Sequence, residues 1–236
     1  INGFLLGPQM WSFHNFTFVE AVEKAQATGA KVVEVYPGQT FSDIDERKFN
    51  HNAGPNLWAN AKIELEKAGM KMVNYGVVHW EDEDELARIF DFAKVMGLPA
   101  ITVEPRDNSD TTWDMLEAMI DEYDIKVGIH NHPVREDNPE YIYWNPERVL
   151  AIVEGRDPRL GLACDTGHWL RSGIDPLEAI KKAEGRIISI HLKDLNEMER
   201  EAHDVPYGQG VANVAGILEE LQRQRFEGNI SIEYEY

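Results

Sequence analysis

The chain has 236 residues, a length that suits one large α/β barrel at least as well as two small domains. Acidic residues outnumber basic ones 42 to 23, and the formal net charge of −19 argues against a protein that binds nucleic acid through its phosphates. No run approaches the ~20 apolar residues of a membrane span, and the single cysteine, Cys164, excludes an internal disulfide. We therefore expect a small molecule or a metal as the partner, with no nucleic acid and no membrane.

Short apolar segments rich in β-branched residues recur along the whole chain, and each is bounded by turn residues. The period and length of these segments are typical of strands that are buried on both faces. Strands are predicted at residues 4–11, 31–37, 71–80, 100–105, 126–133, 160–168, 186–194 and 229–236.

The stretches between these strands have helical periodicity and recognisable starts. Thr17 and Glu20 have the spacing of a capping box, in which each side chain bonds a free amide at the start of a helix. Asn145-Pro146 and Asp175-Pro176 each place a cap residue before a proline whose fixed φ suits the first helical turn. Helices are thus predicted from Thr17 to near Gly29, at 56–68, 82–96 and 110–122, after Asn145, after Asp175, and at 213–225.

Strand and helix alternate almost throughout, which predicts one closed parallel (β/α)₈ TIM barrel spanning residues 1–236. A doubly wound parallel sheet is the alternative. One connection departs from this alternation of strand and helix, because residues 195–212 form a long polar loop with glycine and proline. Loops of this kind more often cover a site than merely link two elements.

Ionisable residues gather at the ends of five consecutive predicted strands, where barrels of this type form their active sites. Each residue alone has an ordinary structural explanation as a cap, a turn residue or a core histidine. Glu233 is harder to explain in that way, because it follows two buried-looking isoleucines and an unpaired buried carboxylate is costly. Together, the carboxylates and imidazoles suit Mn²⁺, Co²⁺, Zn²⁺ or Fe²⁺ better than Ca²⁺. The residues concerned are Glu104, His130, His132, Asp165, His168, His191, Lys193 and Glu233.

Four motifs resemble one known family. The runs CDTGHW, SIHLKD, VPYGQG and SIEYE follow one another as in the xylose isomerase-like barrels, which include sugar phosphate isomerases, sugar 3-epimerases and endonuclease IV. The opening LGPQMWSF and the following TFVEAVEKAQATGAKVVEV also resemble the start of this family, so the resemblance covers essentially the whole chain.

The resemblance implies a metal site and a sugar pocket at the strand ends. It implies metal ligands at Asp165, His191 and Glu233, and a catalytic His168 that holds a substrate hydroxyl. The substrate would also meet Trp11, His14, His79 and Lys193.

The fifth predicted strand departs from the family pattern. Sugar epimerases carry a catalytic, metal-binding glutamate there, whereas this chain has His130-Asn131-His132. A carboxylate is instead present at the end of the fourth strand, as Glu104. We expect Glu104 and His130 to complete the ligand set of one divalent metal ion, with Mn²⁺ as the first choice and Co²⁺, Zn²⁺, Mg²⁺ or Fe²⁺ as alternatives.

The implied reaction moves a proton next to the carbonyl of a sugar or keto-sugar through a metal-stabilised enediolate, as in a sugar isomerase or epimerase. Glu233 can serve as one base, and Glu104 is the first candidate for the second. His130, His132 and Glu136 are the other candidates, and His132 and Glu136 are also expected to contact the substrate. If no second base is available, elimination or hydration of a keto-sugar, catalysed by a lyase, becomes the better interpretation.

Two other functions remain open. One is a non-catalytic sugar-binding barrel. The other is an abasic-site endonuclease, which the negative charge opposes, as do Ala202 and Asp204 near the expected place of that branch's Asp-x-His pair. A homodimer is possible, and the compartment is cytoplasmic or, if a leader preceded Ile1, periplasmic or secreted.

Overall fold

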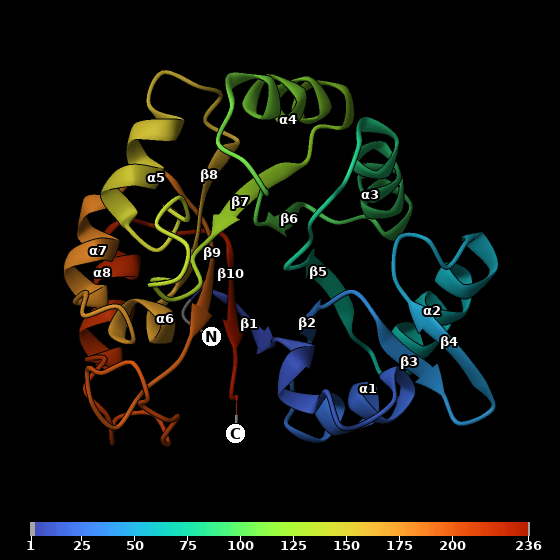
Figure 1. The fold of residues 1–236 in the computed structure, drawn as a ribbon. Helices are drawn as coiled ribbons and strands as arrows, with labels where there is room; N and C mark the ends of the chain where they lie inside the picture. The colour runs from blue at the N-terminus through green and yellow to red at the C-terminus, as the bar shows by residue number, and fades with distance from the viewer. Residues whose placement is uncertain (1–2, 236) are drawn as a thin grey trace.

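The structure, a computed structural model, describes residues 3–235 (Figure 1). Each of the eight predicted strands is present within the predicted range, although each is shorter than predicted. The last prediction extends to Tyr236, which lies outside the described residues. The strands are β1 (Leu5–Pro8), β2 (Val32–Val35), β5 (Lys71–Tyr75), β6 (Ala100–Val103), β7 (Lys126–His130), β8 (Leu160–Asp165), β9 (Ile187–Leu192) and β10 (Asn229–Ile232).

Six of these strands form one parallel sheet in the order β1-β10-β9-β8-β7-β6, and β2 and β5 form a second parallel pair. Single parallel bridges, Gln9 with Glu34 and Val78 with Val103, link the two sheets. The prediction of a parallel barrel of the TIM type is therefore confirmed for the order and direction of the strands. One continuous eight-stranded ladder is not present within residues 3–235.

A glycine lies at each of the two seams between the sheets. A Cβ on Gly7 would lie 1.8 Å from the carbonyl oxygen of Val32, and a Cβ on Gly76 would lie 2.4 Å from that of Thr102. Any side chain at either position would push the neighbouring strand away. These glycines allow β2 and β5 to lie between β1 and β6 (Figure 1).

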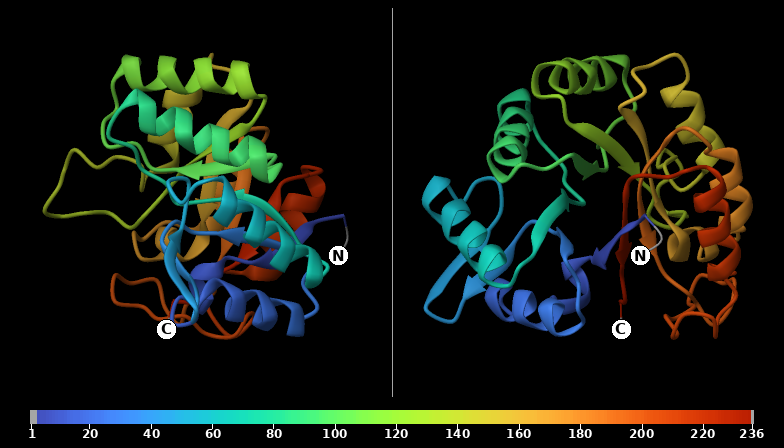
Figure 2. Two further views of the ribbon diagram at one scale, coloured as in Figure 1. Left: turned by 90° about the vertical axis from the view of Figure 1, so that its right-hand side faces the viewer. Right: turned by 180° about the vertical axis from the view of Figure 1, so that it is seen from behind.

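Helices form an outer layer around the strands (Figure 2). The predicted capping box is confirmed, because Thr17 and Glu20 each bond the other's backbone amide. The side chains of Asn145 and Asp175 also cap their helices, each of which has proline at its start. The helices are α1 (Phe18–Ala27), α2 (Pro55–Lys67), α3 (Glu83–Met96), α4 (Asp110–Tyr123), α5 (Pro146–Val153), α6 (Thr166–Leu170), α7 (Pro176–Lys182) and α8 (Val214–Arg223). Within residues 3–235, no helix combines the length and the apolar character needed to cross a bilayer.

The short α6, the 3₁₀ helix η1 (Met10–Phe13) and an antiparallel hairpin were not predicted. The hairpin consists of β3 (Gln39–Ser42) and β4 (Asp45–Phe49), and it follows β2. Its strands are too polar for an apolar pattern to be recognised, since three of the five residues of β4 are exposed. Phe41 and Phe49 attach it to the core through ring contacts with Phe18 of α1.

Candidate active site

The carboxyl ends of the strands surround a cavity of about 270 Å³, which we call the inner pocket. Its volume lies near the lower limit for small-molecule sites. Aromatic, imidazole and carboxylate side chains share its wall, a mixture suited to a small polar ligand. They are Trp11, Tyr36, His79, His130, His132, His168, His191, Glu233 and Glu235.

Asp165 lies at the floor of this site and is held from two sides. Its Oδ1 accepts the backbone N–H of His168 at 2.8 Å, so the carboxylate caps α6. Asn131, at the end of β7, accepts the backbone N–H of Asp165 at 2.8 Å and donates to its carbonyl at 3.0 Å. Because these contacts leave Oδ2 unused, that oxygen is directed toward the other ionisable groups, 3.6 Å from His130 Nε2.

His191, in β9, lies between two carboxylates. Its Nε2 is 2.9 Å from Glu34 Oε1, and its Nδ1 is 3.0 Å from Glu233 Oε2 and 3.2 Å from His130 Nε2. Burial opposes the charged imidazolium, but Glu34 and Glu233 together raise the pKa of His191 well above its usual range. In the neutral form of the ring, a bond from Nε2–H to Glu34 leaves the lone pair of Nδ1 on the side of Glu233 and His130.

Glu34 was missed by the sequence analysis. It is a buried residue of β2, and besides His191 its carboxylate accepts Ser231 Oγ at 2.5 Å and Asn229 Nδ2 at 3.0 Å. Glu34 could have been found in the sequence, because it is the one charged residue in the otherwise apolar run VVEV. Glu233 was recognised for the same reason, as a carboxylate that follows apolar residues of a strand. Carboxylates that bond the outer nitrogen of a metal-binding histidine are common in metal sites, where they fix the orientation of the ring.

Lys193 is fully buried, and it is absent from the residues within 3–235 that line the inner pocket. Its Nζ lies 2.7 Å from Asp165 Oδ2, 3.0 Å from Glu233 Oε2 and 3.3 Å from Glu235 Oε1. Burial opposes the charge, yet these carboxylates raise the pKa of Lys193 above its ordinary value. The ammonium therefore neutralises the floor of the site. Gly167 makes this possible, because a Cβ there would lie 2.7 Å from the Cδ of Lys193. The expected contact of Lys193 with the substrate stays a prediction.

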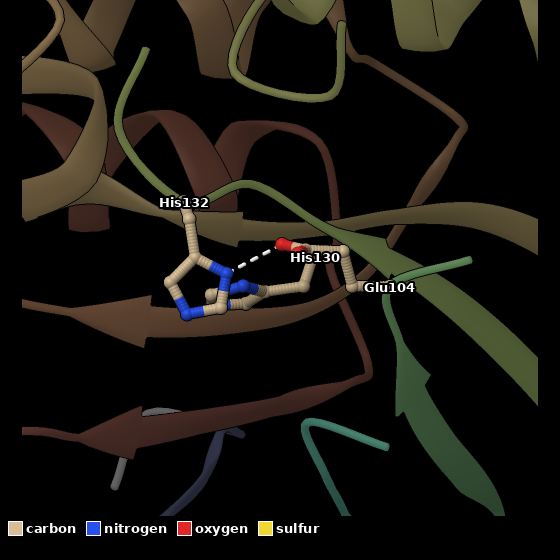
Figure 3. A group of neighbouring side chains, drawn as sticks. All are labelled: Glu104, His130 and His132. Carbon is tan, nitrogen blue, oxygen red and sulfur yellow. Dashed lines mark hydrogen bonds and ion pairs between the residues drawn. The ribbon is translucent and has the colours of Figure 1, made fainter. Parts of the chain in front are cut away.

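Glu104 and His132 form a hydrogen-bonded pair beside His130 (Figure 3). His132 Nδ1 bonds Glu104 Oε2, which also accepts Tyr141 Oη at 2.8 Å, while Arg135 Nη2 bonds Oε1 at 2.9 Å. Burial alone would raise the pKa of Glu104, but the bond and charge of His132 outweigh it and lower the pKa to about 2. Glu104 is thus held as an anion by three donors.

The five expected metal ligands do not all gather at one point. Donor atoms of Asp165, His191 and Glu233 lie within 4.8 Å of one another, and His130 joins Asp165 in a second such group, with His168. Glu104 belongs to a third group, with His130 and His132. The cause is the strand order: β7 lies between β6 and β8, so a side chain at the end of β6 reaches the histidines of β7 before it reaches Asp165.

The group of Asp165, His191 and Glu233 fits a divalent cation. Glu233 Oε2 is buried and has no partner with hydrogen-bond geometry within residues 3–235, although two cationic nitrogens are near it. Three buried carboxylates surround His191 and Lys193: Glu34 bonds His191, Glu233 contacts both His191 and Lys193, and Asp165 contacts Lys193. A divalent cation and Lys193 would balance the charges of these three carboxylates when His191 is neutral, and mixed oxygen and nitrogen donors suit Mn²⁺, Co²⁺, Zn²⁺ or Fe²⁺.

The remaining expected substrate contacts fall into two sets. Trp11, His79 and His132 line the inner pocket. His14 lies behind the indole of Trp11, with ring centroids 4.9 Å apart, and is not among the described residues of the pocket wall. Glu136 is exposed on the segment after β7 and is also absent from that wall.

The loop of residues 195–212 is entirely described, and none of it lines the inner pocket. It is folded onto the end of β9 instead, because the carboxylate of Asp194 accepts the backbone N–H groups of Gly208, Gly210 and Ala212. The loop thereby supports the strand that carries His191 rather than covering the pocket.

Two curated relatives match parts of the sequence. An uncharacterized protein of Methanocaldococcus jannaschii is 31% identical over 131 residues, and this match covers 54% of the chain but only 43% of the relative. An inosose dehydratase of Lacticaseibacillus casei is 21% identical over 262 residues, covering 93% of the chain and 82% of the relative.

Several solved structures share the fold. A protein of unknown function from Parabacteroides distasonis has a TM-score of 0.78 and 34% identity, with 98% of this chain and 91% of that chain covered. A D-tagatose 3-epimerase-like protein has a TM-score of 0.74 at 18% identity and covers 97% of this chain and 90% of its own. The IolI protein, solved with a bound zinc atom, has a TM-score of 0.70 at 16% identity, with 97% and 88% covered.

The family model of the xylose isomerase-like TIM barrel matches residues 22–236. This match confirms the resemblance that the motifs at the strand ends indicated. The chain belongs to the xylose isomerase-like TIM barrel family.

Proposed function

We propose that this protein is a divalent-metal-dependent enzyme that moves a proton next to the carbonyl of a sugar or keto-sugar, as an isomerase or epimerase. The convergence of Asp165, His191 and Glu233 at the floor of the inner pocket carries this proposal. The proposal also takes the chain as a single closed eight-stranded barrel, which the bridges at Gln9 and Val78 support.

In this proposal Asp165, His191 and Glu233 hold the metal ion, with His130 beside them, and Mn²⁺ is the first choice. Glu34 fixes His191 through Nε2 so that Nδ1 is directed inward. When bound, the divalent cation supplies a Lewis acid that polarises the substrate carbonyl and stabilises negative charge.

His132 is the proposed group for proton transfer, with Glu104 as the residue that positions it. Glu104 bonds Nδ1 of His132, which leaves Nε2 as the nitrogen available to a ligand in the inner pocket. This arrangement resembles the carboxylate–imidazole pairs of enzymes, in which the carboxylate sets the tautomer and orientation of the ring. Glu233 remains the candidate for a second base.

His168 is proposed to hold a substrate hydroxyl. Arg171 Nη1 lies 3.3 Å from its Nδ1 and can only donate, so the proton of a neutral His168 belongs on Nε2. Burial lowers the pKa of His168 well below its usual value, which favours the neutral ring. Trp11 and Tyr36 supply an aromatic surface in the same pocket. Such a surface suits the apolar face of a sugar ring.

Elimination by a keto-sugar lyase is the second candidate, and one observation favours it. Glu104, the carboxylate expected to act as the second base, is held by three donors, and its pKa of about 2 makes it a weak base. The pKa of Glu233 is also lowered to about 2, because Lys193 and His191 outweigh the opposing effect of burial. An elimination needs one base, whereas epimerisation by the two-base route needs two.

The test combines metal analysis with a screen of substrates. Protein stripped by a chelator is reloaded with Mn²⁺, Co²⁺, Zn²⁺, Mg²⁺ or Fe²⁺, and its metal content is measured by mass spectrometry. Ketoses and 3-keto-glycosides are then incubated with it in deuterated solvent and followed by NMR. An isomerase or epimerase gives a product of unchanged composition with carbon-bound deuterium, and a dehydrating lyase gives a product that has lost water.

Asp165→Asn should lose both metal and activity, and Glu23→Gln, an exposed change on α1 outside the pocket wall, is the control. A protein that binds none of these metals would contradict the proposal, as would the absence of proton exchange and product with every candidate. Metal-free protein that binds sugar would support the non-catalytic barrel instead.

A further inference from the structure

A second cavity adjoins the inner pocket. It has a volume of about 370 Å³, and we call it the outer pocket. His79 lines both cavities, and the Glu104–His132 pair lies between them, with Glu104 on the outer wall and His132 on the inner wall. The rest of the outer wall comes from residues 105–108 after β6 and from the long segment after β7, which projects from the body of the molecule in the left view of Figure 2.

The outer pocket has two arginines, but neither offers an unpaired charge. Arg106 forms an ion pair with Glu81, and Arg135 bonds Glu104 at 2.9 Å and lies over the ring of Tyr141. A cavity whose cations are already paired gains little from an anionic ligand.

Other side chains of the outer pocket have unused hydrogen-bonding groups. The side chains of Asn138 and Glu140 make no hydrogen bond within residues 3–235. Asn108 uses its Oδ1 to accept Trp113 Nε1 at 3.0 Å, which leaves its amide N–H₂ free. Tyr143 adds an aromatic ring whose hydroxyl is bonded to a backbone carbonyl. Donors, acceptors and an aromatic surface together match a neutral ligand with many hydroxyl groups.

We infer that the outer pocket binds a second sugar unit, so that the substrate is a glycoside of at least two units rather than a free monosaccharide. The inference rests on the proposed function, since it takes the inner pocket as the site of the reacting unit. An inner pocket of about 270 Å³ accommodates one monosaccharide, and space for a larger ligand continues past His79. The linkage between the two units would pass His79 and the Glu104–His132 pair.

The experiment compares ligands that cannot react, so it does not depend on turnover. Calorimetry on the Mn²⁺-loaded protein measures the affinity for methyl glycosides of glucose, galactose and mannose, and for the methyl glycosides of cellobiose, maltose and lactose together with sucrose and trehalose, all of which are blocked at the anomeric carbon. At least one disaccharide should bind more tightly than the matched methyl glycoside. The double change Asn138→Ala with Glu140→Ala should lower the ratio of these two affinities about tenfold, as expected for two hydrogen bonds of ordinary strength.

Asp137→Ala, an exposed change on the same segment but outside both pockets, is the control and should leave the ratio unchanged. The inference is wrong if no disaccharide binds more tightly than its methyl glycoside, or if the double change weakens both ligands by the same factor. Tighter binding of a phenyl glucoside or a glucuronide than of any disaccharide would also overturn it, since the outer pocket would then select an aromatic or anionic group. Proton exchange on monosaccharides tests the proposed function separately, so the two can fail independently.

Discussion

The replacement Glu34→Gln tests whether the second strand orients the metal site. The carboxylate of Glu34 accepts three donors, from His191 at 2.9 Å, Asn229 at 3.0 Å and Ser231 at 2.5 Å. A glutamine offers one oxygen and one N–H₂ group, so at least one of these donors would meet another donor. If the amide nitrogen faces His191, the ring must place its proton on Nδ1, the nitrogen that is needed for the metal.

The expected size of the effect follows from these contacts. Loss of a hydrogen bond to a charged group costs about 1.5–3 kcal/mol, and changes behind a metal-binding histidine typically reduce metal affinity about 10- to 100-fold. A 10- to 100-fold change in affinity corresponds to about 1.4–2.8 kcal/mol of binding free energy. We expect Glu34→Gln to weaken Zn²⁺ and Mn²⁺ binding by such a factor without removing any proposed ligand.

Competition with a chromophoric chelator measures the metal affinity, and urea unfolding of the metal-free protein reports whether the fold is retained. Glu23→Gln removes the same charge from an exposed position on α1 and serves as the control. A Glu34→Gln protein that folds and binds metal within twofold of the original would refute the role assigned to this carboxylate.

Three further predictions address the packing, the pH dependence and the proton transfer. Gly167→Ala places a Cβ 2.7 Å from the stem of Lys193 and should lower the free energy of unfolding by about 1–3 kcal/mol; an unchanged urea midpoint would contradict the tight approach. Burial lowers the pKa of His51 in the folded state, so the unfolded chain takes up the proton first and stability should fall as the pH falls below about 6.5. His51→Gln should therefore reduce the stability lost between pH 7 and pH 5 in urea titrations, and equal losses in both proteins would count against this account. Glu104→Gln and His132→Gln should each slow solvent proton exchange about 100-fold while metal content is retained, and full exchange in the His132 variant would exclude that residue as the transferring group.

Local sequence patterns contain most of the information about the elements and the strand-end residues. The capping box at Thr17 and the cap-proline pairs before α5 and α7 depend on residues a few positions apart, so a reader of the sequence can recognise them. The eight strands are recognisable because parallel strands buried on both faces are continuous apolar runs. Asp165 and His191 are recognisable because each follows such a run at its carboxyl end.

The identity of the partner of each ionisable side chain is not a local property. Glu34 and His191 are 157 positions apart, and they meet because the strands that carry them surround the same interior. Lys193 reaches Asp165 through the space that Gly167 leaves open, and Glu104 pairs with His132 because β7 separates β6 from β8. Local patterns in the chain thus indicate which residues are available for chemistry and that they lie at the carboxyl ends of the strands. The pairing of these residues with one another follows from the fold alone, because such contacts depend on the lateral order of the strands and on the room between side chains.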